Sequence, residues 1–265
     1  MIFRKFLPMS KRRRFLLTSI ILSLGFVGIQ FLNDQNRFWA IGILGLLSAL
    51  LFAWSLLENL GKNMTLLTLI LPMFFTFGVG IFWFLLPANL LTRVPIVIFY
   101  GIGIYVLALT MNIYSVSASI KTIALLRAAR GVGFVLTLVT AFLVFDAILS
   151  LKVSILLTVP LIFFFSFPLF FQGLWAFDLN EDFSKDLLLM SMVGSLVISE
   201  VSAAIYFWPV TIVVGSLFLT VMIYLILGLS QAKIEGRLFI ATIREHLTVG
   251  ALVFVAIFFA THWGA

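Results

Sequence analysis

The sequence lacks cysteine and contains few charged residues. None of its 265 residues is Cys, and Asp, Glu, Lys and Arg together make up 10% of the chain, against about 25% in an ordinary soluble domain. The missing thiols exclude disulfide bonds and thiolate metal sites. The scarcity of charge excludes an ordinary soluble domain, because the surface of such a domain needs more charged side chains than this chain offers.

Motifs for catalysis and for nucleotide binding are also missing. The sequence contains no P-loop, no Gly-x-Ser-x-Gly and no His-Glu-x-x-His, and its histidines are His246 and His262. Each of these motifs supplies a phosphate cradle, a nucleophile or a metal site. We therefore expect neither catalytic residues nor a cofactor, with Mg²⁺ at the acidic loop described below as the remaining alternative.

Long apolar runs occupy almost the whole chain. Hydrophobic residues make up 63% of it, and a helix needs about 20 mostly apolar residues to cross a bilayer. The sequence therefore predicts an all-α fold, a polytopic membrane bundle of about nine transmembrane helices. The segments expected to span are 15–32, 38–57, 64–87, 94–114, 131–150, 154–176, 187–208, 210–229 and 247–264.

The positive charges predict the orientation. With a cytosolic N-terminus, 14 of the 17 Lys and Arg residues fall on the cytosolic side, and the outer side holds Arg37, Arg93 and Lys152. Cytosolic loops collect Lys and Arg. We therefore expect a multi-pass protein of the cytoplasmic (inner) membrane with its C-terminus outside. The net charge of +7 then indicates contact with anionic lipid headgroups and not with nucleic acid.

The spacing of the segments suggests an internal repeat. Segments beginning at residues 15, 38, 94 and 131 recur with an offset of 116 positions, and the segment beginning at 64 is the exception, with an offset of 123. This pattern predicts two parallel four-helix units and a ninth helix. Even spacing of helices in a compact membrane protein is the alternative. The predicted parts are a basic cytosolic segment 1–14, a first unit 15–114, a basic interfacial segment 115–130, a second unit 131–229, a basic interfacial segment 230–246, and the ninth helix with the C-terminus, 247–265.

The two basic segments between the units carry short apolar stripes. Val116, Ile120 and Ile123 are spaced as one stripe of a helix. Basic amphipathic helices commonly lie on the inner leaflet of a membrane. We expect interfacial helices here, and docking of a cytosolic protein partner is the alternative.

Glu200 lies near the middle of an apolar segment. A carboxylate at the bilayer centre costs about 2.5 kcal/mol or more. We expect Glu200 to point into protein, about a quarter turn from a packing face. It is then either a coupling site for protons or cations, or a neutral carboxyl group hydrogen-bonded to another helix. That packing face carries small residues spaced by four: Ser191, Ser195, Ser199 and Ala203.

Two further polar residues are candidate coupling groups. Asp146 and His262 lie near the outer ends of their segments and, like Gln30, follow the offset of 116 positions. We expect both side chains to reach interfacial water. If the repeat holds, Asp146 and His262 could meet, and a carboxylate–imidazole pair can titrate near neutral pH.

A cytosolic loop before the seventh segment is rich in acids. Carboxylates at such spacing could hold Mg²⁺ or Ca²⁺ through oxygen ligands. The favoured alternative is capping of the next helix by these acids and Ser184, because capping is common and needs no metal. The acids are Asp178, Glu181, Asp182 and Asp186.

With nine helices and this loop after the sixth, the chain resembles the intramembrane aromatic prenyltransferases of the UbiA type. That family carries aspartate-rich motifs after helices 2 and 6, which bind Mg²⁺-diphosphate. The resemblance implies a lipid-modifying enzyme with its metal at 178–186. The first motif position, however, reads Glu58-Asn59-Leu60-Gly61-Lys62-Asn63, without the paired aspartates, so half of the metal site is missing.

Three functions fit these observations. The first is a non-catalytic membrane subunit or permease-like component of a larger assembly, in contact with lipids and with a protein partner or a second copy. The second is an autonomous secondary transporter of a small or lipidic solute, with Glu200 as the coupling acid. The third is a prenyltransferase-like enzyme of lipids.

Overall fold

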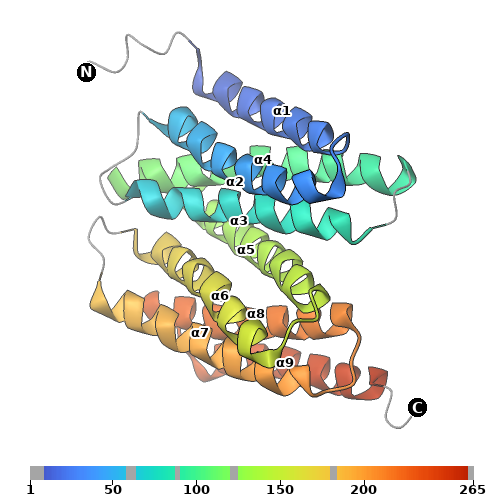
Figure 1. Ribbon diagram of the computed structural model, residues 1–265. Helices are drawn as coiled ribbons and strands as arrows, with labels where there is room; N and C mark the ends of the chain where they lie inside the picture. The colour runs from blue at the N-terminus through green and yellow to red at the C-terminus, as the bar shows by residue number, and fades with distance from the viewer. Residues whose placement is uncertain (1–8, 58–63, 87–89, 120–124, 180–183, 262–265) are drawn as a thin grey trace. The chain divides into compact units, whose positions relative to one another are not determined.

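The protein is a set of helices without strands throughout the residues that the structure describes (Figure 1). The computed structural model describes residues 9–57, 64–86, 90–119, 125–179 and 184–261. The all-α prediction is confirmed. The helices are α1 (Lys11–Ile29), α2 (Asp34–Leu56), α3 (Met64–Phe84), α4 (Leu90–Ser119), α5 (Leu125–Ser150), α6 (Ile155–Asp178), α7 (Lys185–Tyr206), α8 (Ile212–Ile234) and α9 (Ile240–Ala260).

Eight of these helices, α2 to α9, are long and apolar enough to cross a membrane. The helix α1 differs because its first four residues, Lys11 to Arg14, are basic and occupy part of its 19 residues. The remaining apolar part is about 22 Å long at 1.5 Å per residue, shorter than the 30 Å hydrocarbon core of a typical bilayer. The protein is therefore a polytopic helical bundle with eight clear spanning helices and a shorter apolar first helix.

The chain divides into two compact units. Unit 1 holds the described residues up to Leu136 together with Leu179, and unit 2 holds Thr137–Asp178 and the described residues from Ser184 onward. The boundary falls inside α5, whereas the sequence placed it between 115 and 130. It falls there because α5 is one continuous helix whose first three turns belong to unit 1.

Unit 1 is a closed ring of four helices. The helix α1 packs against α2 and α4, and α3 packs against α2 and α4. Aromatic rings fill its centre: the ring centroid of Phe26 lies 5.0 Å from that of Trp83 and 4.9 Å from that of Tyr100. The Tyr100 hydroxyl shares a hydrogen bond of 3.1 Å with Thr76 Oγ1. The core of unit 1 is thus made of packed rings, and the buried hydroxyl group of Tyr100 has a hydrogen-bond partner.

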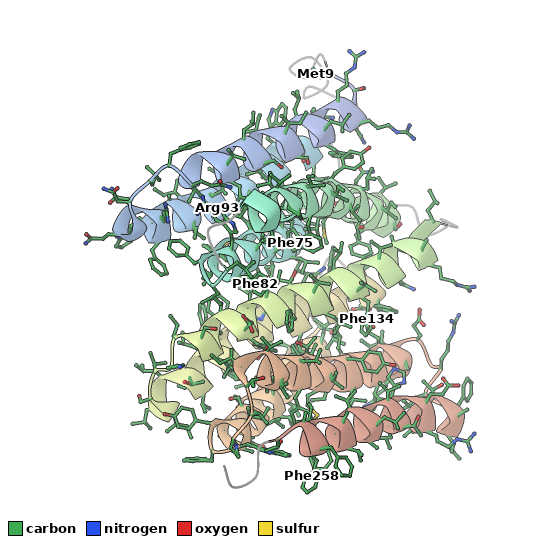
Figure 2. All side chains as sticks on the ribbon, turned by 90° about the vertical axis from the view of Figure 1, so that its right-hand side faces the viewer. Met9, Phe75, Phe82, Arg93, Phe134 and Phe258 are labelled. Atoms are coloured by element: carbon green, nitrogen blue, oxygen red, sulfur yellow. The ribbon has the colours of Figure 1, made fainter. Side chains whose placement is uncertain are left out.

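Unit 2 packs more loosely at one side. The helices α6, α7 and α8 contact one another, and α9 packs against α8. Ile257 is the buried residue of α9, and Phe258 points away from the neighbouring helices (Figure 2). Most of α9 therefore presents apolar side chains to its surroundings, as a helix at the edge of a membrane bundle does.

The structure corrects the prediction of separate interfacial helices at 115–130 and 230–246. The helix α4 continues to Ser119 and α5 begins at Leu125. Likewise α8 runs to Ile234, the chain turns at Gly236 with φ +68°, and α9 begins at Ile240. Helix propensity explains part of this: good helix formers such as Leu, Ala, Arg, Gln and Lys fill the first turns of α5 and the last turn of α8, so these helices continue beyond their apolar parts.

Candidate functional site

Glu200 lies on the exposed face of α7, so the expectation that it points into protein was wrong. It also lies six residues before the end of α7 at Tyr206, about 9 Å along the axis at 1.5 Å per residue, and not at mid-helix. Exposed residues on both sides continue the same stripe of the helix. We call this stripe the Glu200 face, and it consists of Leu189, Val193, Leu196, Glu200 and Ala204.

The buried face of α7 explains this position. Residues at alternating spacings of three and four are buried there, among them Ser191, Ser195, Ile198 and Ser202. A row spaced strictly by four drifts by about 40° per step around a helix of 3.6 residues per turn, so Ala203 is only half-buried. The true packing seam lies about half a turn from Glu200.

The serine hydroxyls on this seam bond to their own helix. Ser191 Oγ donates to the Leu187 carbonyl at 2.7 Å, and Ser195 Oγ donates to the Ser191 carbonyl at 2.7 Å. Their main contribution is therefore small volume, which allows close approach of helices. Gly194 acts in the same way, since an added Cβ there would lie 3.1 Å from the ring of Phe170 on α6. The sequence prediction used a row of residues spaced strictly by four, and it therefore missed Gly194 and Ser202, which are also buried on this seam.

Asp146 is buried, with 3% of its surface exposed, whereas the sequence predicted contact with interfacial water. Its Oδ1 accepts a hydrogen bond of 3.2 Å from Ser216 Oγ on α8. Ser216 is also buried, and its hydroxyl lies 3.0 Å from the Val213 carbonyl. This hydrogen bond joins α5 to α8, and no sequence pattern predicts a contact between residues 70 positions apart.

A pocket lies above this pair, at the end of unit 2 where α5 and α7 finish and α8 begins. We call this end the α7–α8 end. The pocket has a volume of about 210 Å³. Leu149, one turn along α5 from Asp146, and Gly215, next to Ser216, form part of its wall. The remaining lining residues are Lys152, Ile205, Tyr206, Trp208, Val210, Thr211 and Ile212.

Local hydrogen bonds hold the wall of the pocket in place. Thr211 caps α8, its hydroxyl accepting from the Val214 backbone N–H at 3.4 Å. The Trp208 indole N–H donates to Thr261 Oγ1 at 3.0 Å, which ties the α7–α8 turn to the end of α9. The ring of Trp208 also packs edge-on against Phe254, with centroids 5.8 Å apart. The pocket wall is therefore built from α5, α7, α8 and the turn that α9 supports.

Lys152 supplies the pocket's charge. It follows the end of α5 with φ 48°, in the left-handed region, which is costly for residues other than glycine. In the sequence, Lys152 stands out as one of the three cations predicted on the outer side. That position was the one feature of the sequence that pointed to Lys152. Only the fold shows that it lines a cavity.

The acidic loop is only partly described. Glu181 and Asp182 lie outside the described residues, and so does His262, so its pairing with Asp146 stays a prediction. Ser184 caps α7 by accepting a hydrogen bond from the Leu187 N–H at 3.1 Å, and Asp186 occupies the first turn. Among the residues that the structure describes, no group of three or more His, Cys, Asp or Glu side chains could hold a metal ion.

One family model matches this chain. It is described as "Protein of unknown function (DUF5656)" and matches residues 17–260. Neither a curated protein nor a solved structure matches the chain significantly. The family match includes Asp146, Glu200 and every residue that lines the pocket. Because the match extends over nearly the whole chain, the protein belongs to the DUF5656 family.

Proposed function

We propose that this polytopic helical membrane protein is a non-catalytic subunit of a larger membrane assembly. In this arrangement the Glu200 face of α7 packs against a transmembrane helix of a partner protein that carries a hydrogen-bond donor. We place the protein in the cytoplasmic membrane with its N-terminus in the cytosol and with the shorter helix α1 crossing the membrane as well, because the asymmetry in Lys and Arg arises when all nine helices span.

The exposed position of Glu200 carries this proposal. Ionisable residues within a membrane almost always face protein or a water-filled cavity, because contact with lipid is costly. Here the carboxyl group lies on an exposed stripe whose other members are Leu189, Val193, Leu196 and Ala204. A partner helix that donates a hydrogen bond to Glu200 and packs on these apolar side chains would remove the cost.

The absence of cysteine from the chain makes a direct test possible. Leu196→Cys and Val193→Cys introduce single thiols on the Glu200 face, to which a benzophenone maleimide can be attached. We expect illumination in the native membrane to give one discrete adduct of higher mass from each position. The control is Leu252→Cys on α9, which is equally apolar and 70% exposed, and should give no discrete protein adduct.

The role of the carboxyl group is tested separately. Glu200→Leu removes the hydrogen-bonding group, and the yield of the adduct should fall about threefold, as expected for loss of one hydrogen bond of about 0.6 kcal/mol between membrane helices. Glu200→Gln keeps a polar group of the same shape and should retain more of the adduct. If neither position on α7 gives an adduct, or Leu252→Cys gives the same one, the subunit proposal fails.

A second function, secondary transport, is favoured by a different observation. A buried carboxyl group, Asp146, lies one helical turn below an open pocket, an arrangement that suits coupling of a solute to a proton or cation. By this criterion Asp146 is a better coupling acid than Glu200, which is exposed. In this function the protein would work without partners.

Transport is tested with the protein reconstituted alone in vesicles. A pH gradient should drive uptake or counterflow of a solute by the unmodified protein, and Asp146→Asn should abolish the dependence on that gradient. Glu200→Gln is the matched control and should leave it intact. Equal loss in both variants, or no loss in either, contradicts the role of Asp146.

A further inference from the structure

We propose that the pocket at the α7–α8 end of unit 2 binds the phosphate-bearing headgroup of a membrane lipid, with Lys152 as the residue that contacts the phosphate. This inference goes beyond the subunit role and does not depend on it. It rests on the chemistry of the lining, the size and depth of the pocket, and the backbone conformation of Lys152.

The lining is suited to an amphipathic anion. Lys152 is the charged residue among the nine that line the pocket, and Thr211 adds a hydroxyl group. Leu149, Ile205 and Val210 make the rest of the wall largely apolar. A lysine ammonium group forms strong, charge-assisted hydrogen bonds to phosphate oxygens, while the aliphatic walls accept the glycerol and the first methylene groups of a lipid.

The size of the pocket favours a headgroup over a complete solute. Its volume is about 210 Å³, smaller than the 300–1,000 Å³ typical of pockets that enclose a whole drug-sized ligand. A ligand that fills it must extend outside the protein. The acyl chains of a lipid would do so along the exposed apolar surfaces of the neighbouring helices.

The depth of the pocket matches that of lipid phosphates. Its walls come from the last residues of α5 and α7 and the first residues of α8, so it lies where spanning helices leave the hydrocarbon. Tyr206 and Trp208 belong to the same wall, and these residue types concentrate at the level of the headgroups. A phosphate therefore needs no displacement along the membrane normal to reach Lys152.

The backbone at Lys152 supports a role for its side chain. A left-handed residue after a helix is usually glycine, and another residue there costs about 1 kcal/mol or more. Lysine occupies this position with φ 48°. The local structure favours glycine, yet the residue at this position is a lysine that lines the pocket.

Asp146 limits how deep the anion can go. Its carboxyl group lies one turn below Leu149 and is held by Ser216. A phosphate next to Lys152 is therefore separated from this acid by the apolar wall, and deeper entry would bring two acidic groups together. The site thus holds a headgroup at its mouth and does not conduct anions inward.

The test measures lipid retention on the purified full-length protein by native mass spectrometry. The probe is dioleoylphosphatidylglycerol, and dioleoylglycerol is the same lipid without the phosphate. We expect the unmodified protein to retain the phospholipid and not the diacylglycerol. Lys152→Gln should weaken retention about tenfold, the size expected for loss of a charge-assisted hydrogen bond, and Lys152→Arg should restore it.

Arg93→Gln is the matched control. Arg93 is another cation of the predicted outer side, but its guanidinium group lies 5.4 Å from the ring centroid of Trp83 in unit 1. This substitution should leave retention unchanged. Val210→Trp fills the pocket and should abolish retention, and Asp146→Asn should strengthen it. Circular dichroism and melting curves establish that each variant is folded.

Several results would overturn the proposal. These are equal retention by Lys152→Gln and the unmodified protein, equal retention of dioleoylglycerol, and weaker retention in Asp146→Asn. Displacement of the lipid by inorganic phosphate at comparable concentration would instead assign the pocket to free anions.

Discussion

Two helix pairs, one in each unit, meet in different ways. In unit 1, where α1 meets α4, the rings of Phe26 and Tyr100 pack together, and Trp83 covers them toward the end at which α3 finishes and α4 begins. The guanidinium group of Arg93, which is labelled in Figure 2, lies over the ring of Trp83 at 5.4 Å from its centroid. In unit 2, where α5 meets α8, the contact is a hydrogen bond between Asp146 and Ser216, and a pocket opens above it.

Under the proposals made above, this difference separates a part of the chain that stabilises the fold from a part that binds a ligand or couples transport. Packed rings give a helix pair large contact areas without unsatisfied polar atoms, so the centre of unit 1 serves stability. A buried acid and an open cavity cost stability and are kept where a ligand or proton is handled. The predictions below test this division with substitutions in both units, from the largest expected loss of stability to the smallest.

The largest expected effect is on the rings of unit 1. Tyr100→Ala should lower the free energy of unfolding by about 3 kcal/mol or more, because it leaves a large cavity between Phe26 and Phe75. Tyr100→Phe removes only the hydrogen bond to Thr76 and should cost about 1 kcal/mol. Unfolding in mixed detergent micelles measures both. Similar losses in the two variants would show that the rings do not carry the stability of unit 1.

An intermediate effect is expected where glycine allows close contact. In Gly103→Ala the added Cβ would lie 2.5 Å from the ring of Phe75, which is fully buried in unit 1 and cannot move, so we expect a loss of about 1–3 kcal/mol. In Gly228→Ala the new methyl would meet His246 Nε2 at 2.6 Å, but His246 is only half-buried at the edge of unit 2 and can turn away, so the loss should be smaller.

The control for both glycines is Gly28→Ala in α1. No atom lies within 4 Å of an added Cβ there, so the better helix propensity of alanine should leave stability unchanged or raise it by up to about 1 kcal/mol. The same detergent titration compares the three variants. A larger loss of stability for Gly228→Ala than for Gly103→Ala would show that the surroundings of Gly228 in unit 2 are more rigid than those of Gly103 in unit 1.

The smallest effect is expected at the polar pair of unit 2. Asp146→Asn and Ser216→Ala should each change the free energy of unfolding by less than about 1 kcal/mol, since single hydrogen bonds between membrane helices contribute about 0.6 kcal/mol on average. A loss as large as that of Tyr100→Ala would make Asp146 a structural residue and remove the contrast between the units.

The sequence predicted the helices well because their signal is local. Nine apolar runs predicted the nine helices found in the described residues, and the end of the fifth was placed correctly at Ser150. The starts of α4 and α5 were placed too late, because Arg93 and Arg130 interrupt the apolar pattern without interrupting the helix. The length of an apolar run indicates how much of a helix lies in the hydrocarbon core, and a helix can continue beyond the hydrocarbon at either end.

The site was less predictable because it depends on which face of a helix is covered. The row Ser191, Ser195, Ser199 correctly indicated small residues on α7, but a row spaced by four rotates around the helix and placed Glu200 too near the seam. For Asp146 the missing information was the partner helix. Asp146 contacts Ser216 on α8, and periodicity within one segment does not report contacts with another segment.

The way in which α9 is attached to unit 2 has a consequence for folding during synthesis. It is held on one side, at one end by the Trp208–Thr261 hydrogen bond and at the other by the ring of His246 stacked on Tyr224 at 5.1 Å. Chains emerge from the ribosome N-terminus first, so α6, α7 and α8 can pack before α9 is released. Arrival of α9 then supports the turn at Trp208, and the pocket wall is completed only when synthesis of the last helix is finished.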